Sequence, residues 1–105
     1  MALAAAEMAF AGGLGIALDL TAVPQEGCSR EEEILFSESA SRILLEVPAD
    51  RAAELEKILA GFPVARIGTW EKEPIFRVKG LSGQPLLEVP IHRLREAWEG
   101  PFKGW

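Results

Sequence analysis

The sequence is poor in the side chains that bind transition metals, with one cysteine, Cys28, and one histidine, His92, in 105 residues. A lone cysteine cannot form an internal disulfide, and Cys and His supply most zinc ligands in proteins. The composition therefore argues against a transition-metal site and against a disulfide framework. It fits a reducing compartment, so we expect a cytoplasmic protein.

The sequence also lacks a basic excess and a long apolar run. Its formal net charge is -5, whereas proteins that bind duplex nucleic acid usually present a basic face. No apolar run approaches the roughly 20 residues of a membrane span. No Lys or Arg precedes the apolar N-terminal stretch, and Glu7 interrupts it, so we interpret this stretch as a helix instead of a signal peptide. We expect neither a nucleic acid nor a membrane as partner.

Hydrophobic residues make up 49% of the chain and charged residues 26%, which is ordinary for one soluble globular domain spanning residues 1–105. Hydrophobic periodicity and the positions of Gly and Pro predict four helices, at 2–11, 30–36, 51–60 and 91–98. The same signals predict five strands, at 14–23, 42–47, 64–70, 75–79 and 86–89. This order predicts an α/β (α+β) fold with a mixed or antiparallel sheet and helices packed on it.

The first helix is almost wholly apolar, and Glu7 is its only charge. Such a helix should be buried on most sides, yet a small domain offers little interior. No N-cap residue precedes it, as if the chain were truncated there. We therefore expect a missing partner surface, which is either an N-terminal part of a longer protein or a second copy in a homodimer through this helix.

Two other helix starts carry cap signals. Ser29 with Glu32 three residues later predicts a capping box, and Asp50 is the predicted N-cap of the third helix. That helix has a predicted apolar stripe formed by Ala52, Leu55, Ile58 and Leu59.

The stretch FSESASR, residues 36–42, has the residue types of a magnesium–phosphate contact. Serine hydroxyls and backbone N–H groups donate to phosphate oxygens, a carboxylate suits Mg²⁺, and an arginine can hold a phosphate through two bonds. The alternative is a polar turn, in which Ser and Glu cap the backbone and the arginine pairs with a nearby glutamate. From residue types alone the turn is favoured. The candidate binding residues are Ser37, Glu38, Ser39, Ser41 and Arg42, with Glu38 also the candidate metal ligand.

Other features have simpler interpretations. The glycine-rich run at 12–15 follows a helix instead of opening one, so a tight helix-to-strand corner is favoured over a phosphate loop. His92 is favoured as a surface or capping residue and Cys28 as an inert thiol. The run Glu31-Glu32-Glu33 is interpreted as a solvated helix start. Core or C-terminal packing is expected for Trp70, Trp98, Trp105, Phe62, Phe76 and Phe102.

Several stretches together resemble one family. The segments AEMAFAGGLGIALDL, LFSESASRILLEVP, PVARIG and PIHRLREAWEGPF are similar to the C-terminal domain of the synthetase subunit (subunit II) of phosphoribosylformylglycinamidine synthase. The resemblance runs from Ala2 to about Phe102. Strings like PVARIG also occur in the related aminoimidazole ribonucleotide synthetases and selenophosphate synthetases, whereas LFSESASR and LREAWEG are more specific.

The resemblance implies an ATP-dependent C–N ligase of de novo purine biosynthesis. In that reaction formylglycinamide ribonucleotide and glutamine-derived ammonia give formylglycinamidine ribonucleotide, with ATP and Mg²⁺ bound. The implied partners are N-terminal synthetase domains, a glutaminase subunit and a small accessory subunit. The resemblance also implies nucleotide, Mg²⁺ and substrate contacts in the segment that matches Phe36 to Arg42.

Three features of the family have no counterpart in this sequence. They are the phosphate loop, the catalytic histidine, and a motif in which an aspartate is followed by Ser-Asp/Glu-Gly-Gly. We therefore expect a C-terminal fragment that is folded but inactive alone. Two alternatives remain open. One is a related synthetase of the aminoimidazole ribonucleotide synthetase type, and the other is a free-standing α/β interaction module that dimerises through its first helix and sheet edge.

Overall fold

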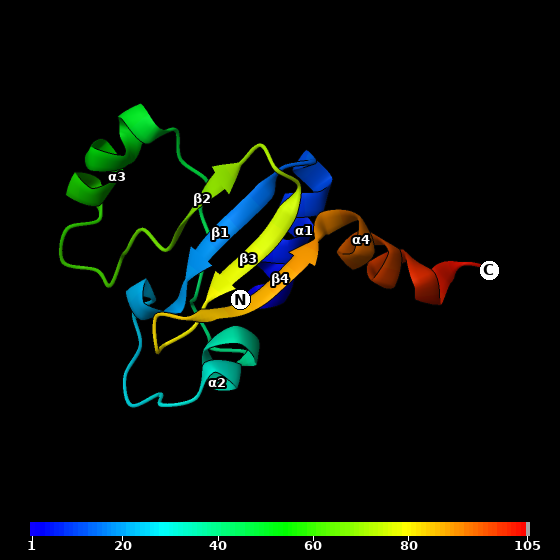
Figure 1. The fold of residues 1–105 in the computed structure, drawn as a ribbon. Coiled ribbons are helices and arrows are strands. Elements are labelled where there is room, and N and C mark those ends of the chain that lie inside the picture. The colour runs from blue at the N-terminus through cyan, green and yellow to red at the C-terminus, as the bar shows by residue number, and fades with distance from the viewer. Residues whose placement is uncertain (105) are drawn as a thin grey trace.

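The computed structural model describes residues 1–104, so Trp105, predicted to take part in packing, lies outside the described residues. Within these residues, four helices and four strands follow one another in the order α1-β1-α2-α3-β2-β3-β4-α4 (Figure 1). Three short 3-10 helices, η1 (Leu20–Ala22), η2 (Ala49–Arg51) and η3 (Gly100–Phe102), connect or extend them. In chain order, the main elements are α1 (Ala2–Gly12), β1 (Gly15–Asp19), α2 (Glu31–Phe36), α3 (Ala52–Ile58), β2 (Gly68–Glu71), β3 (Ile75–Lys79), β4 (Pro85–Pro90) and α4 (Ile91–Glu99).

The strands form one mixed sheet in the order β2-β1-β3-β4. The central pair, β1 and β3, is parallel, with Ile16 opposite Phe76 and Leu18 opposite Val78. The outer pairs, β1 with β2 and β3 with β4, are antiparallel. The predicted fold class is therefore confirmed.

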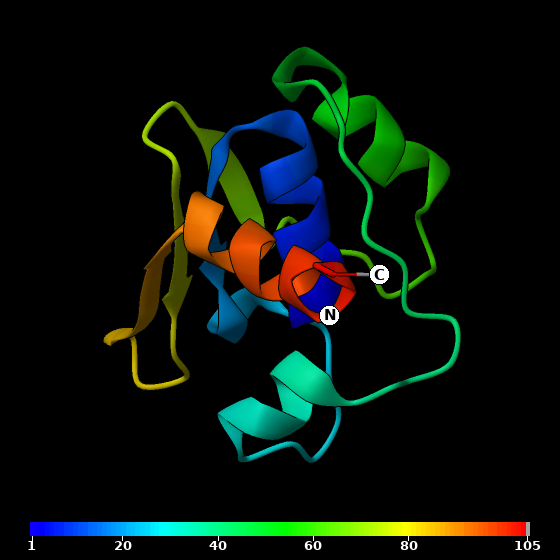
Figure 2. The same ribbon diagram turned by 90° about the vertical axis from the view of Figure 1, so that its right-hand side faces the viewer.

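One face of this sheet is covered by helices, and the other is open. Figure 2 shows α1 and α4 side by side on the same side of the sheet. Successive side chains of a strand alternate between its two faces, so even-numbered residues of β1, β2 and β3 point to the covered face. In β4 the odd-numbered residues do so, since Val89 lies opposite Phe76 and Leu87 opposite Val78. The core consists of Ala5, Ala9, Ile16, Leu18, Leu20, Val23, Ile34, Leu35, Phe76, Val78 and Ile91.

The corner between α1 and β1 depends on two glycines. Gly13 has φ 70°, a left-handed conformation that favours glycine and ends helices. The Leu14 N–H donates to the Ala9 carbonyl at 3.2 Å and closes the last turn. A Cβ on Gly15 would overlap the Glu73 carbonyl, so only glycine lets the two backbones approach this closely. The predicted helix-to-strand corner is confirmed, since a strand and no helix follows these glycines.

Helix α1 is less buried than its apolar sequence predicts. Ala5 and Ala9 are buried against the sheet, but Leu3 is 65% exposed and Ala4 and Ala11 are also exposed. One sheet face and α4 cover only part of the helix, in line with the expectation that a domain of this size offers it little interior. The missing partner surface stays a prediction. Homodimerisation through α1 stays a prediction. No helix in residues 1–104 has the length and apolar content needed to cross a lipid bilayer.

Aromatic side chains divide between the core and the α1–α4 contact. Phe76 is 2% exposed at the centre of the sheet, and Trp70 is half-buried. The ring centroid of Trp98 lies 5.7 Å from that of Phe10 and 6.3 Å from that of Phe102. The pair with Phe10 holds the end of α4 against α1, as expected for C-terminal packing. Phe102, for which packing was also expected, is 67% exposed.

The predicted strand at 42–47 is wrong. Within the described residues, no strand forms between the end of α2 at Phe36 and the start of β2 at Gly68. Residues 64–67, the first part of the strand predicted at 64–70, are therefore outside the sheet as well. Ile43 is 76% exposed and Leu45 60% exposed. A strand needs a neighbouring backbone to pair with, and here the sheet ends at β2 and β4.

Both predicted N-caps are wrong as well. Arg30, with an extended backbone, takes the cap position of α2, so Ser29 lies one residue too early to form a capping box. Asp50 lies inside η2, and Arg51 precedes α3 without a side-chain cap.

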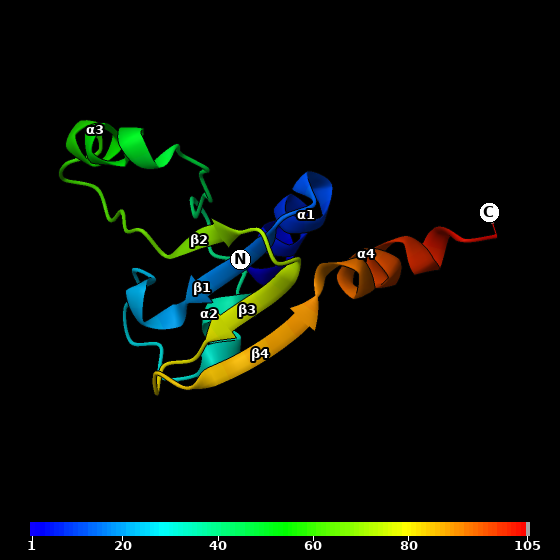
Figure 3. The ribbon, with the colours of Figure 1, turned by 45° about the horizontal axis from the view of Figure 1, so that its top comes forward.

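Helix α3 stands apart from the rest of the molecule (Figures 1 and 3). None of its residues is buried, and Ile58 of the predicted apolar stripe is 70% exposed. Phe62, predicted to be in the core, is 69% exposed just beyond this helix. Within residues 1–104, no residue of the predicted stripe belongs to the core or packs against it.

Candidate functional site

The candidate segment, residues 36–42, leaves the C-terminal end of α2. That helix is fastened to the core by Ile34, which is fully buried, and by Leu35, which is 7% exposed. The Ser37 N–H donates to the Glu33 carbonyl at 3.1 Å and ends the helix. The position and direction of the segment are therefore set by α2.

Most polar side chains of the segment are accessible. Glu38, Ser39 and Ser41 are exposed, and Ser37 is half-buried. The hydroxyl oxygens of Ser37 and Ser39 lie 3.4 Å apart, a distance at which either can donate to the other. An exposed pair of hydroxyls beside a carboxylate offers donors and acceptors to a ligand such as a phosphate. The structure brings these predicted residues together on one short loop.

The second half of the segment is a turn with one unusual backbone conformation. Ser41 has φ 62°, in the left-handed region that residues other than glycine seldom adopt. The Arg42 Nη2 donates to the Pro24 carbonyl at 3.3 Å and so ties the end of the segment to the loop after η1. The alternative in which Arg42 pairs with a glutamate is therefore not what the structure contains.

The chain contributes few metal ligands of its own at this place. Within residues 1–104, no three His, Cys, Asp or Glu side chains gather closely enough to hold a metal ion. Glu38 is a lone carboxylate on the segment. Mg²⁺ commonly binds through one or two carboxylates together with water and substrate phosphates, so a single exposed glutamate suits a shared site.

Of the two other candidates, His92 has the surface position that was expected, and the inertness of Cys28 stays a prediction. His92 is exposed near the start of α4. Cys28 is half-buried against the core, and its N–H donates to Gln25 Oε1 at 2.8 Å. Neither lies in the candidate segment.

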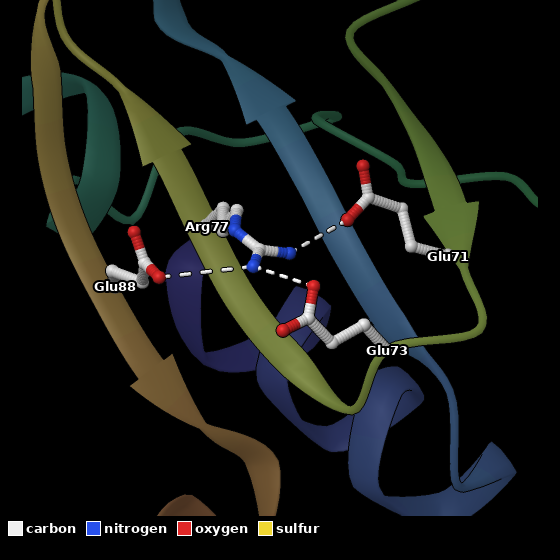
Figure 4. A network of polar contacts seen from close by, with 4 residues as sticks. All are labelled: Glu71, Glu73, Arg77 and Glu88. Carbon is white, nitrogen blue, oxygen red and sulfur yellow. Dashed lines mark hydrogen bonds and ion pairs between the residues drawn. The ribbon is translucent and has the colours of Figure 1, made fainter.

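An ionic network on the open sheet face was not predicted from the sequence. Figure 4 shows Arg77 of β3 between Glu71, Glu73 and Glu88. Its guanidinium donates to Glu71 at 2.9 Å and to Glu73 at 2.8 Å, and it lies 3.7 Å from Glu88. The hydrogen bond to Glu73, followed by the nearby negative charges, raises the pKa of Arg77 above its ordinary range. The alternation of Phe76, Arg77 and Val78 was the available signal, because it predicts an outward arginine.

A second ionic contact lies on the same face. The Asp19 carboxylate, at the end of β1, pairs with Lys79 and accepts the Thr21 hydroxyl at 2.6 Å. These bonds, the one with Lys79 first, lower the pKa of Asp19. Together the two contacts make the open face polar, as expected for a sheet with one face in water.

The comparisons with known proteins agree with this fold. Residues 2–80 match the family described as AIR synthase related protein, C-terminal domain. The chain belongs to this family. The matched region includes α1, the candidate segment and three of the four strands. No solved structure matches the chain.

Curated relatives of this family member are phosphoribosylformylglycinamidine synthase subunits PurL. The protein from Deinococcus radiodurans is 35% identical over 99% of this chain, which is 14% of that relative. The one from Thermococcus kodakarensis is 37% identical over 94% of this chain and 13% of the relative. The one from Synechococcus sp. (strain CC9902) is 41% identical over 86% of this chain and 12% of the relative. The chain thus spans 12–14% of the length of these relatives.

Proposed function

We propose that this chain is the C-terminal domain of the synthetase subunit of a cytoplasmic phosphoribosylformylglycinamidine synthase. The observation that carries the proposal is the identity of 35–41% with three PurL subunits over 86–99% of the chain. The reaction proposed for the whole enzyme is the ATP-dependent conversion of formylglycinamide ribonucleotide and ammonia to formylglycinamidine ribonucleotide. A glutaminase subunit would supply the ammonia, and a small accessory subunit would complete the complex.

Within this enzyme, we propose the segment at 36–42 as this domain's contribution to the nucleotide and substrate site. Its exposed hydroxyls would donate to phosphate oxygens, and Glu38 would help to hold Mg²⁺. The arginine guanidinium carries five donors, and the bond to Pro24 involves only one of them, so Arg42 would also contact a phosphate. Bound Mg²⁺ supplies neutralisation of phosphate charge, which phosphoryl transfer requires.

The remaining groups of the site would come from other parts of the enzyme. The phosphate loop, the catalytic histidine and the Asp-containing motif implied by the family resemblance are not among these 105 residues. The isolated chain is therefore expected to be folded but inactive. Measurable turnover of formylglycinamide ribonucleotide by the isolated chain would contradict this part of the proposal.

The decisive experiment is Glu38→Ala in the full-length synthetase. Since changes near a metal ligand commonly weaken metal affinity by about 10–100-fold, we expect at least about a 10-fold rise in the Mg²⁺ concentration needed for half-maximal turnover. Glu46→Ala is the matched control, because Glu46 is also exposed and lies eight residues further along the chain. An equal Mg²⁺ requirement in the two variants would contradict the role of Glu38 and favour the interpretation of the segment as a polar turn.

A further inference from the structure

The position of the candidate segment depends on a helix too short to be stable alone. Helix α2 has six residues, and isolated helices of this length do not persist in water. Ile34 and Leu35 anchor its C-terminal half in the core. The question is what holds its N-terminal half.

Glu31 makes a long-range contact at that end. Its Oε1 accepts the Leu81 N–H at 3.0 Å, although the two residues are 50 positions apart in the chain. Leu81 begins the turn between β3 and β4, and its side chain packs against the core. In Figure 3, α2 lies beside this end of the β3–β4 hairpin.

The turn between β3 and β4 leaves one N–H group and enough space for the Glu31 carboxylate. The Gly80 N–H donates to the Gln84 carbonyl at 2.8 Å, and the Gly83 N–H donates to the Gly80 carbonyl at 3.0 Å. The Leu81 N–H points instead to Glu31. Gly80 is buried, and a Cβ on it would overlap Glu31 Oε1, so glycine at this position leaves room for the carboxylate.

The three consecutive glutamates of α2 therefore differ in role. Glu32 pairs with Arg30 at 3.2 Å, and both side chains are more than 60% exposed. Glu33 is exposed, whereas Glu31 is half-buried and reaches across to the hairpin. The interpretation of all three as a solvated helix start is wrong for Glu31.

We propose that Glu31 is a positioning residue for the ligand-binding segment. By joining α2 to the β3–β4 turn, Glu31 sets the orientation of the helix and with it the direction in which residues 36–42 leave at Ser37. Arg42 fixes the other end of the segment to the Pro24 carbonyl. The binding part of this inference rests on the proposed function, and the contact itself does not.

The contact is tested first in the 105-residue chain by amide hydrogen exchange. Glu31→Ala is expected to speed exchange of the Leu81 and Ser37 amides by at least about 10-fold, because the Leu81 N–H loses a hydrogen bond to a charged acceptor. Glu31→Gln keeps an Oε1 acceptor and should restore most of the protection. Glu33→Ala removes the same charge from the same helical turn and should leave both amides as in the native chain.

Gly80→Ala tests the same contact from the hairpin side. It should displace the carboxylate and raise exchange at Leu81 as Glu31→Ala does. In the double variant, the Leu81 amide should exchange no faster than in Glu31→Ala alone, because both changes act on one contact. Equal exchange in Glu31→Ala and Glu33→Ala, or additive effects in the double variant, would overturn the proposed contact whatever the enzyme does.

Positioning is then tested in the full-length synthetase. Glu31→Ala should raise the KM for ATP or for formylglycinamide ribonucleotide several-fold, Glu31→Gln should restore it, and Glu33→Ala should not change it. Loosened amides with native kinetics would overturn the positioning role and leave the proposed function intact. Absence of turnover in the native synthetase would instead overturn the proposed function, and the exchange data would still decide the contact.

Discussion

Charged residues on the open sheet face are held in pairs and networks instead of standing alone. Asp19 ends β1, pairs with Lys79 of the neighbouring strand, and accepts bonds from the Thr21 N–H and hydroxyl. Arg77 occupies the equivalent outward position two residues before Lys79 and holds three glutamates. These contacts are partly exposed, so each contributes little to stability at high salt. On the outer face, Lys79 joins β3 to β1, and Arg77 joins β3 to β2 and β4.

The Asp19 contacts predict a pH dependence of stability. Because the folded-state pKa of Asp19 is lowered from its ordinary 3.8, the stabilisation is complete above that pH. It is lost as the pH falls below 3.8 through the lowered value. Asp19→Asn should therefore be less stable than the native chain at pH 6, and the difference should shrink in acid.

Urea unfolding at a series of pH values measures this effect. Asp50→Asn, at an exposed aspartate in η2, is the control and should track the native chain at every pH. A constant gap between Asp19→Asn and the native chain from pH 6 to pH 2 would show that the Asp19 charge has no such role.

At the scale of elements, the α1–β1 corner joins the helix layer to the sheet. Gly13 ends α1 in a left-handed conformation, and Gly15 starts β1 against the backbone of residues 73–75. The glycine-rich run therefore works by backbone shape and close approach. A phosphate-binding glycine loop would instead need a helix N-terminus after the glycines.

Two alanine substitutions in this corner should have opposite outcomes. Gly15→Ala forces a Cβ against the Glu73 carbonyl and is expected to destabilise the chain by about 2–3 kcal/mol, as overpacking does. At Gly12, nothing lies within 4 Å of an added Cβ. Gly12→Ala should therefore be neutral or stabilising by up to about 1 kcal/mol, because it restricts the unfolded chain.

Chemical denaturation of both variants gives the comparison directly. Similar midpoints for Gly15→Ala and Gly12→Ala would mean that the close approach at Gly15 is not a constraint.

The whole molecule is more extended than a compact domain of its length. Its radius of gyration is 14.7 Å, whereas about 13 Å is expected for a compact chain of this size. Its extents are 48 × 32 × 28 Å, and α3 stands away from the sheet in Figure 1. The core is formed by the sheet, α1, α2, the start of α4, and Leu20 and Val23 in and after η1, so stability should be unevenly distributed.

Native-state hydrogen exchange should reveal this gradient. Strands β1 and β3 contain core residues, so their amides should exchange only through global unfolding. Amides of α3 should exchange at least about 100-fold faster, because the helix buries no residue and a seven-residue helix is marginal alone. Protection of α3 equal to that of β3 would contradict the detached position of this helix.

Much of the fold follows from local sequence patterns. All four helices, and the strands at β1, β3 and β4, were predicted from periodicity and from Gly and Pro positions. The strand at 42–47 failed because alternation alone does not provide a pairing partner. Both caps failed because the exact start of a helix depends on one residue's backbone conformation.

The candidate segment was recognised from its residue types and family resemblance, and the structure places those residues on one exposed loop. Its support was not predicted. Glu31 and Leu81 are 50 positions apart, so no local pattern connects them. The same holds for the Arg42–Pro24 bond and for the glutamates around Arg77.

The sequence by itself determined the types of most elements, the glycine corner, and the polar character of residues 36–42, because these depend on local propensity and backbone sterics. Only the tertiary structure decided which segments join the sheet, which of three adjacent glutamates is structural, and which apolar residues stay exposed. Those outcomes depend on hydrogen bonds and burial between residues far apart in the chain, and a local pattern contains no information about such partners.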